Sequence, residues 1–126
     1  MRKIPPPAIN PENKPYFDAA VDGKLLLKFC NSCKKPHHYP RALCPHCFSD
    51  KTEWREAKGT GTVYSWSLLV ALQDPYCIAY VTLDEGVTML TNLVDCDFKS
   101  LKVGMKVKAV FKPTDGGAPV PMFTAA

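Results

Sequence analysis

The sequence lacks several features that would indicate common functions. No apolar run approaches the roughly 20 residues that a membrane-spanning helix needs. There is no Walker or Rossmann phosphate-binding loop, no internal repeat and no low-complexity tract. No signal peptide is recognisable, so we expect a cytoplasmic protein rather than a secreted disulfide scaffold.

Acidic residues are missing from one stretch, residues 23–49, which contains no Asp or Glu. The same stretch contains five cations: Lys24, Lys28, Lys34, Lys35 and Arg41. The chain as a whole has a formal net charge of +4 and is therefore only mildly basic. These cations either offset an anionic cluster nearby or form a phosphate-binding face, and the first interpretation is favoured.

Two Cys-x-x-Cys pairs lie within this stretch. Cys30 and Cys33 form the first pair, Cys44 and Cys47 form the second, and ten residues separate the pairs. A two-residue spacer lets a tight turn direct both sulfurs at one ion, and two such turns complete a tetrahedral four-thiolate shell. The spacing therefore predicts one metal site, which would supply most of the folding free energy of this small polar segment.

Four protein sulfurs leave no open coordination position, so we expect structural zinc rather than Lewis-acid catalysis. Three histidines are spare donors that a four-thiolate site does not require: His37, His38 and His46. Four thiolates also suit a rubredoxin-like redox iron. Such knuckles usually have glycine after the second cysteine, whereas Lys34 and Phe48 stand there, and this departure favours zinc.

The remaining two cysteines, Cys77 and Cys96, lie in apolar, strand-like surroundings. A free cysteine in such a place usually acts as a small buried hydrophobe, and we expect this of both. A catalytic nucleophile at Cys77 is the less favoured alternative, because no nucleophile–base pair is recognisable in the sequence.

Residues 1–22 predict an extended arm followed by one short helix. The arm is rich in proline, which favours extended backbone. Pro15 suits the first position of a helix from Tyr16 to Val21, which Gly23 would end. Tyr16 and Phe17 lie on its apolar face, which either covers the neighbouring sheet or docks on a partner.

Residues 23–54 predict a rubredoxin-like zinc ribbon. A strand at Leu25–Phe29 leads into the first knuckle, and residues 36–40 form the turn between the knuckles. Trp54 is expected to pack near the base of the ribbon, because one large aromatic side chain can close a small core.

Residues 55–126 predict a five-stranded, partly open OB-fold barrel, so the whole chain is expected to be mainly β. Alternating residues predict a long strand over 62–70, with Tyr64 and Trp66 on one face, where core packing is their favoured role. Four further strands are expected in this part: 76–83, 87–94, 106–111 and a short one near 121–123.

In order and spacing, these pieces resemble the acyl-CoA-associated zinc-ribbon/OB-fold family, long catalogued only as a domain of unknown function. The resemblance covers nearly the whole chain. It rests on these segments: Pro15-Tyr16-Phe17, Gly23-Lys24-Leu25, Cys30-Asn31-Ser32-Cys33, His38-Tyr39-Pro40-Arg41, Cys44-Pro45-His46-Cys47, Gly59-Thr60-Gly61-Thr62-Val63-Tyr64-Ser65-Trp66, Leu101-Lys102-Val103-Gly104-Met105-Lys106-Val107 and Pro121-Met122-Phe123.

Members of that family are non-catalytic partners of thiolase-superfamily enzymes, including thiolases, acetyltransferases, hydroxymethylglutaryl-CoA synthases and steroid side-chain aldolases. The resemblance implies an accessory subunit without activity of its own, in a hetero-oligomer whose substrate is an acyl-CoA. Candidate contacts to the coenzyme A phosphates are Lys28, Lys34, Lys35 and Arg41. Candidate contacts to the enzyme partner are Tyr16, Phe17, Tyr64 and Trp66.

Two other functions stay open from the residues alone. Zinc ribbons and OB-fold barrels both bind nucleic acid in other proteins, but such proteins normally have a dense basic stripe with exposed aromatics. With four thiolates and one Zn²⁺ counted, the charge here falls to about +2. An independent enzyme, such as a thioesterase, or an electron carrier is the third hypothesis.

Overall fold

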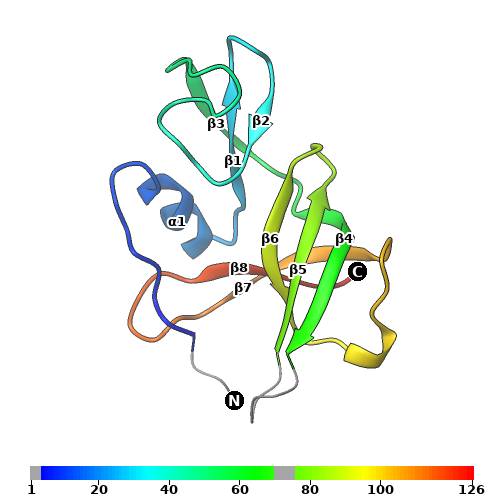
Figure 1. Ribbon diagram of the computed structural model, residues 1–126. Coiled ribbons are helices and arrows are strands. Elements are labelled where there is room, and N and C mark those ends of the chain that lie inside the picture. The colour runs from blue at the N-terminus through cyan, green and yellow to red at the C-terminus, as the bar shows by residue number, and fades with distance from the viewer. Residues whose placement is uncertain (1–3, 70–75) are drawn as a thin grey trace.

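The computed structural model describes residues 4–69 and 76–126 and has two β-parts with a helix beside both (Figure 1). The helix α1 is Lys14–Val21. The ribbon strands are β1 (Leu26–Cys30), β2 (Pro36–His37) and β3 (Thr52–Glu56). The barrel has β4 (Thr60–Leu69), β5 (Tyr76–Leu83), β6 (Thr88–Leu93), the short 3-10 helix η1 (Phe98–Ser100), β7 (Lys106–Lys112) and β8 (Val120–Ala125). Val70, the predicted end of the long strand, lies outside the described residues.

The arm and α1 connect the ribbon to the barrel. Asn10 and Asn13 exchange backbone-to-side-chain hydrogen bonds of 2.8 and 2.9 Å just before the helix. The Asn13 side chain also donates to the Tyr39 hydroxyl at 2.8 Å, which fixes the start of α1 against the ribbon. Tyr16 and Phe17 are buried, so the apolar face of α1 covers the core of this chain.

The ribbon is a three-stranded antiparallel sheet in the order β2-β1-β3. Trp54 of β3 lies opposite Lys28 of β1, whose ammonium lies 4.4 Å from the ring centroid. The ring is partly buried against the hydrophobic core, which confirms the expected position of Trp54 near the base. Sequence analysis did not predict β3, because its charged residues do not alternate with apolar ones.

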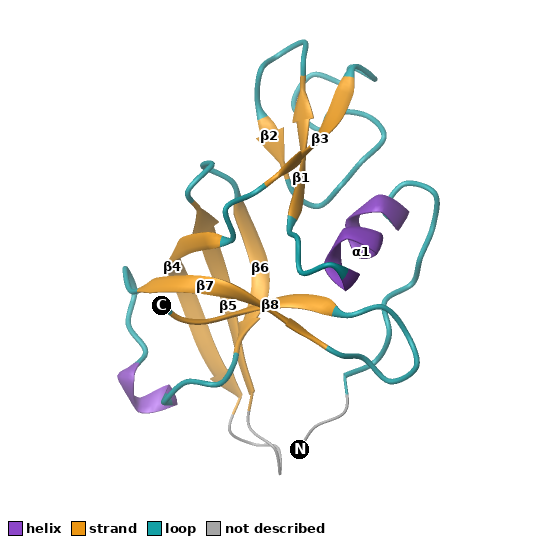
Figure 2. Ribbon diagram, turned by 180° about the vertical axis from the view of Figure 1, so that it is seen from behind, coloured by secondary structure: helices purple, strands orange, loops and turns teal. Residues whose placement is uncertain are grey.

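The barrel is closed, in the order β4-β5-β6-β8-β7, whereas a partly open barrel was predicted. The last strand closes it: β8 pairs antiparallel with β7 and meets β6 in parallel at Leu93 and Phe123. Phe123 is completely buried there. Seen from behind, β7 and β8 cross the barrel strands, and β8 begins on the side of α1 and runs away from it toward the C-terminus (Figure 2).

A β-bulge in β4 overturns the prediction that Tyr64 packs in the core. The register with β5 shifts between Val63 and Ser65, so the single residue Tyr64 has no partner of its own and is 67% exposed. Before the bulge Val63 faces the core, and after it Trp66 lies opposite buried Ala79. Trp66 nevertheless stays 36% exposed, so neither aromatic is enclosed.

No helix within the described residues is long and apolar enough to span a membrane. The α-helix α1, the one α-helix in residues 4–69 and 76–126, has 8 residues. This agrees with the absence of a long apolar run in the sequence.

Candidate metal centre and the pocket beside it

Two matching knuckles position the four cysteines. The Lys34 N–H donates to the Cys30 carbonyl at 2.9 Å, and the Phe48 N–H donates to the Cys44 carbonyl at 2.8 Å. A second hydrogen bond closes each turn: the Cys30 N–H donates to the Lys35 carbonyl, and the Cys44 N–H donates to the Ser49 carbonyl. The same hydrogen bonds in both turns explain why the sequence repeats a Cys-x-x-Cys spacing.

The position after each second cysteine has left-handed backbone although it is not glycine. Lys34 has a φ of 60° and Phe48 has a φ of 63°. A side chain in this conformation costs about 1 kcal/mol or more, and the cost must be offset by the surrounding structure. Metal coordination by the cysteine directly before each residue can supply that offset.

The four sulfurs form the only group of three or more potential metal-ligating side chains among the described residues, and they all lie within 4.8 Å of one another. Cys30 Sγ lies 3.6 Å from Cys47 Sγ, and Cys33 Sγ lies 3.7 Å from Cys44 Sγ. Zn–S bonds of about 2.3 Å in a tetrahedron place sulfurs about 3.8 Å apart. The donor set therefore fits structural zinc, as predicted.

Backbone donors and burial shift the pKa values of the first two thiols in opposite directions. The Cys33 N–H, 3.5 Å from Cys30 Sγ, lowers the pKa of the Cys30 thiol to about 6. Desolvation raises the pKa of the Cys33 thiol to about 12. Without a cation the second thiolate would be unstable beside the first, whereas a divalent ion neutralises both.

The predicted basic residues of the ribbon differ in their contacts. Lys28 stacks on Trp54, and Arg41 lies 4.0 Å from the Glu12 carboxylate and near the Tyr39 ring. The other two, Lys34 and Lys35, are exposed and make no ion pair within 4.0 Å among the described residues. Among the four predicted contacts, Lys34 and Lys35 are therefore the two whose ammonium groups are exposed and not engaged in an ion pair among the described residues.

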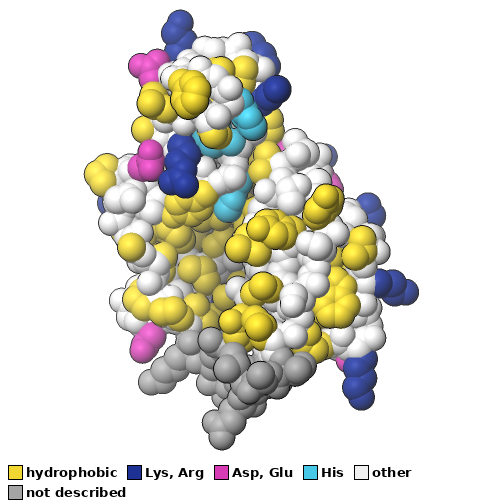
Figure 3. Space-filling view, in the orientation of Figure 1, with side chains coloured by type: hydrophobic (Ala, Val, Ile, Leu, Met, Phe, Trp, Pro, Cys, Tyr) yellow, Lys and Arg dark blue, Asp and Glu magenta, His cyan; other side chains and the backbone are white. Residues whose placement is uncertain are grey.

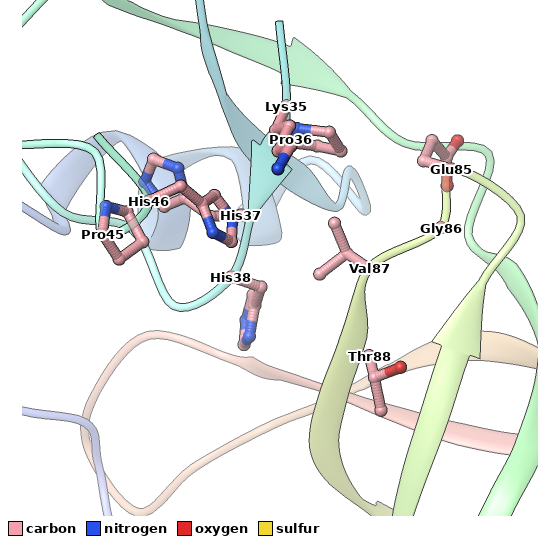
Figure 4. A pocket seen from close by; sticks show the side chains of 10 residues that line it. All are labelled: Lys35, Pro36, His37, His38, Pro45, His46, Glu85, Gly86, Val87 and Thr88. Atoms are coloured by element: carbon pink, nitrogen blue, oxygen red, sulfur yellow. The ribbon is translucent and has the colours of Figure 1, made fainter. Parts of the chain in front are cut away.

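The three spare histidines line a pocket between the ribbon and the barrel, with a volume of about 370 Å³. Figure 4 shows them across from residues of the loop between β5 and β6 and from Thr88, the first residue of β6. The ribbon side consists of Lys35, Pro36, His37, His38, Pro45 and His46, and the barrel side of Glu85, Gly86, Val87 and Thr88. Sequence analysis missed the barrel side, because a turn signal such as Asp84-Glu85-Gly86 carries no information about what faces it.

His38 is held by a tyrosine rather than by a metal. Its Nε2 lies 3.1 Å from the Tyr16 hydroxyl, and burial lowers the pKa of His38 to about 4. Burial likewise raises the pKa of Tyr16. The pair is therefore neutral at physiological pH and joins α1 to the ribbon.

The remaining cysteines behave as the sequence predicts. Cys77 is completely buried, Cys96 is half-buried against the core, and burial raises the pKa of both thiols. A buried thiol with a raised pKa is a poor nucleophile. The described residues therefore give no support to catalysis by Cys77.

The fold and the centre agree with sequence comparisons. A family model for the rubredoxin-like zinc ribbon domain of ChsH2 matches residues 17–53, and one for its C-terminal OB-fold domain matches residues 54–112. A DUF35 domain-containing scaffold protein of Methanothermobacter thermautotrophicus is 32% identical over 90 residues, which cover 66% of this chain and 68% of that protein. The chain belongs to the DUF35 family. This confirms the resemblance identified from the sequence motifs.

Other relatives and solved structures are similar over larger parts of the chain. A protein of Thermomonospora curvata named "Probable enoyl-CoA hydratase alpha subunit" is 37% identical over 127 residues, and the chain spans 40% of its length. The solved structure titled "Ltp2-ChsH2(DUF35) aldolase" has a TM-score of 0.81 at 36% identity and covers 94% of this chain and 98% of that one. A DUF35 structure from Sulfolobus solfataricus, at 20% identity and a TM-score of 0.69, shares the fold.

Proposed function

We propose that this DUF35 chain is a non-catalytic subunit that docks on an enzyme of the thiolase superfamily acting on an acyl-CoA in the cytoplasm. Similarity to the chain in the Ltp2–ChsH2 aldolase structure carries the proposal, because it extends over nearly the full length of both chains. The closed four-sulfur centre supports a structural role for the metal, since four sulfurs leave no position for substrate.

An exposed apolar face of the barrel supports docking on a partner. Tyr80 of β5 pairs directly with Leu90 of β6, and they are 47% and 56% exposed. Tyr64 stands out from the bulge in the neighbouring strand β4. We call Tyr64, Tyr80 and Leu90 the outer barrel face, and Figure 3 shows hydrophobic side chains gathered over these strands. Exposed apolar groups that adjoin one another commonly mark protein interfaces.

The predicted partner contacts divide into two pairs. Tyr16 and Phe17 are buried within this chain, so a partner would not contact them directly in this conformation. Tyr64 and Trp66 are exposed, and they are the members of the predicted set that we place at the interface.

Lys34 and Lys35 are proposed to face the phosphates of the coenzyme A that the partner binds. Reversing both charges, Lys34→Glu with Lys35→Glu, should raise the Kd of the assembled complex for coenzyme A about tenfold at low salt. The matched control reverses two exposed lysines of the barrel, Lys99 and Lys102. An unchanged Kd in the ribbon variant would contradict the proposed phosphate contact but not the proposed docking on a partner.

Docking is tested by tagging the chain in its native host and identifying proteins that remain in stoichiometric amounts through size exclusion at moderate salt. A thiolase-superfamily subunit should copurify with the unchanged chain and be lost from Leu90→Lys. The control is Val21→Lys, which places the same charge on an exposed apolar residue at the end of α1, away from the outer barrel face. Loss of the copurifying enzyme from both variants would show that an added charge at either position prevents binding, which would contradict docking through the outer barrel face.

Two outcomes would refute the accessory-subunit hypothesis. Copurification of nucleic acid whose affinity falls steeply with added salt would favour a nucleic-acid-binding protein instead. Turnover of acyl-CoA by the purified chain alone, lost in Cys77→Ser, would make it an enzyme in its own right.

A further inference from the structure

We propose that the pocket between the ribbon and the barrel is a binding site for an amino-substituted nitrogen heterocycle of the aminopurine class. It is separate from the metal centre, whose sulfurs are not among the lining residues. Its two walls come from parts of the chain that are about 40 residues apart in sequence. Only the folded arrangement of ribbon on barrel creates it.

The ribbon wall presents a buried polar side chain without a partner. His37 is 4% exposed, and neither ring nitrogen makes a hydrogen bond of ordinary geometry in the structure. Burial lowers the pKa of His37 and keeps the ring neutral. The Arg41 backbone raises this pKa again, but by less than burial lowers it. A neutral imidazole has one donor and one acceptor, and leaving them unpaired costs free energy that a ligand could recover.

The barrel wall presents a second unpaired group, on Glu85. One carboxylate oxygen accepts from the Lys58 N–H at 2.9 Å, while the other, Oε1, is buried and has no partner. An ionised carboxylate only accepts hydrogen bonds, so whatever satisfies Oε1 must be a donor. The two walls together therefore call for a ligand with donors and acceptors on different edges.

The pocket is poorly suited to simpler ligands. A phosphate or carboxylate would place negative charge beside Glu85 Oε1, which lacks a donor, so only the Lys35 side of the pocket suits an anionic group. A metal ion would need ligands close together, but among the described residues only the four cysteines form such a group.

A flat aminopurine matches the shape and polarity of the pocket. Its exocyclic amine donates, its ring nitrogens accept on other edges, and its faces are apolar. Pro36, Pro45 and Val87 supply apolar lining beside the polar groups (Figure 4). The volume of about 370 Å³ is at the small end of the range for ligand pockets, about 300–1,000 Å³, and suits one ring system.

Titration of the zinc-loaded chain with adenosine, followed by ¹H–¹⁵N NMR, tests the proposal without any mutation. We expect a Kd of about 0.1–1 mM, with the largest shifts at His37, Glu85 and Val87. Purine riboside lacks the exocyclic amine donor, so it should bind about tenfold more weakly or worse. Equal affinity for both nucleosides, shifts elsewhere, or no saturation at about 10 mM adenosine would overturn the proposal.

A variant pair locates the donor contact. Glu85→Gln keeps the shape and the acceptor for Lys58 but adds an amide donor, so adenosine affinity should fall about tenfold while zinc content stays unchanged. Glu53→Gln is the matched control, because Glu53 lies on an exposed strand of the ribbon outside the pocket. Equal affinity in both variants would contradict the role of Glu85.

The source of the heterocycle is distinguished by comparing adenosine, AMP and coenzyme A. Tighter binding of coenzyme A would identify the adenine end of a coenzyme thioester, and equal affinities would identify a free nucleoside or nucleotide; both support an aminopurine site. The proposal does not depend on the accessory-subunit function, because adenosine has no phosphate and the assay has no partner. Failure of adenosine to bind would leave partner capture unaffected.

Discussion

Removal of the metal should unfold the ribbon while leaving a folded barrel. The ribbon encloses few apolar side chains, and two of its best-buried residues are the ligands Cys30 and Cys44. The barrel contributes most of the buried cluster, including Val63, Val81 and Phe123, and Leu25 and Leu27 of the ribbon join its margin. We therefore expect EDTA at neutral pH to act locally rather than to denature the whole chain.

The magnitude follows from comparing the metal with the apolar core of the ribbon. A structural zinc contributes about 10–16 kcal/mol of apparent binding free energy near pH 7. Each fully buried leucine, such as Leu27, contributes about 1.5–3 kcal/mol, and a whole domain is stable by only about 5–15 kcal/mol. The free energy lost with the metal is therefore larger than the free energy that burial of the few apolar residues of the ribbon supplies.

Amide hydrogen exchange measures the two parts separately. The β1–β3 pairs, from Leu26 with Glu56 to Cys30 with Thr52, should lose protection in the apo-protein, while the β4–β5 pairs stay protected. Cys44→Ser should behave like the apo-protein, whereas Cys96→Ser should retain both the metal and ribbon protection. Cobalt should restore the ribbon and give sulfur-to-metal charge-transfer absorption.

Two results would refute this reasoning. Protection of β1–β3 in a metal-free sample would show that the ribbon is held by packing, chiefly against α1 and the barrel. Simultaneous loss of β4–β5 protection would show that ribbon and barrel form one cooperative unit. A red iron-containing preparation would overturn the assignment of zinc itself.

Three further changes have defined outcomes. Gly61→Ala should destabilise the protein by about 1–3 kcal/mol in urea unfolding, because its Cβ would lie 2.6 Å from the Thr82 carbonyl oxygen; an unchanged midpoint would show that β4 and β5 can separate there. Phe123→Ala should cost about 3–5 kcal/mol, since this completely buried ring joins β6 to β8, and a smaller loss would mean that the barrel collapses around the cavity. The pKa of His38 is lowered from 6.5 to about 4, so between these values only the unfolded chain binds the proton, and the protein becomes less stable as the pH decreases. The free energy of unfolding of the zinc-loaded protein should decrease by about 1 kcal/mol from pH 7 to pH 5.5, and that of His38→Gln should decrease less. Equal decreases in both proteins would show that His38 is not the cause.

The metal centre could be predicted from the sequence because its determinants are local. A Cys-x-x-Cys turn directs its own two sulfurs, so only the approach of the second turn depends on the fold. The end of the helix at Val21 was similarly local, since Gly23 favours the backbone that follows a helix, whereas its start at Lys14 lies two residues before the predicted Tyr16. The alternation of apolar residues likewise predicted the barrel strands.

The tertiary structure decided features that depend on contacts between distant segments. The bulge at Tyr64 follows from the pairing of β4 with β5, and it moves an aromatic from a predicted core position to the surface. Closure of the barrel needs β8 to meet both β7 and β6. The pocket brings His37 of the ribbon and Glu85 of the barrel into one lining, although no periodicity or motif connects them. A sequence pattern specifies the chemistry and local geometry of each segment, whereas the packing of segments onto one another determines which of those chemistries meet.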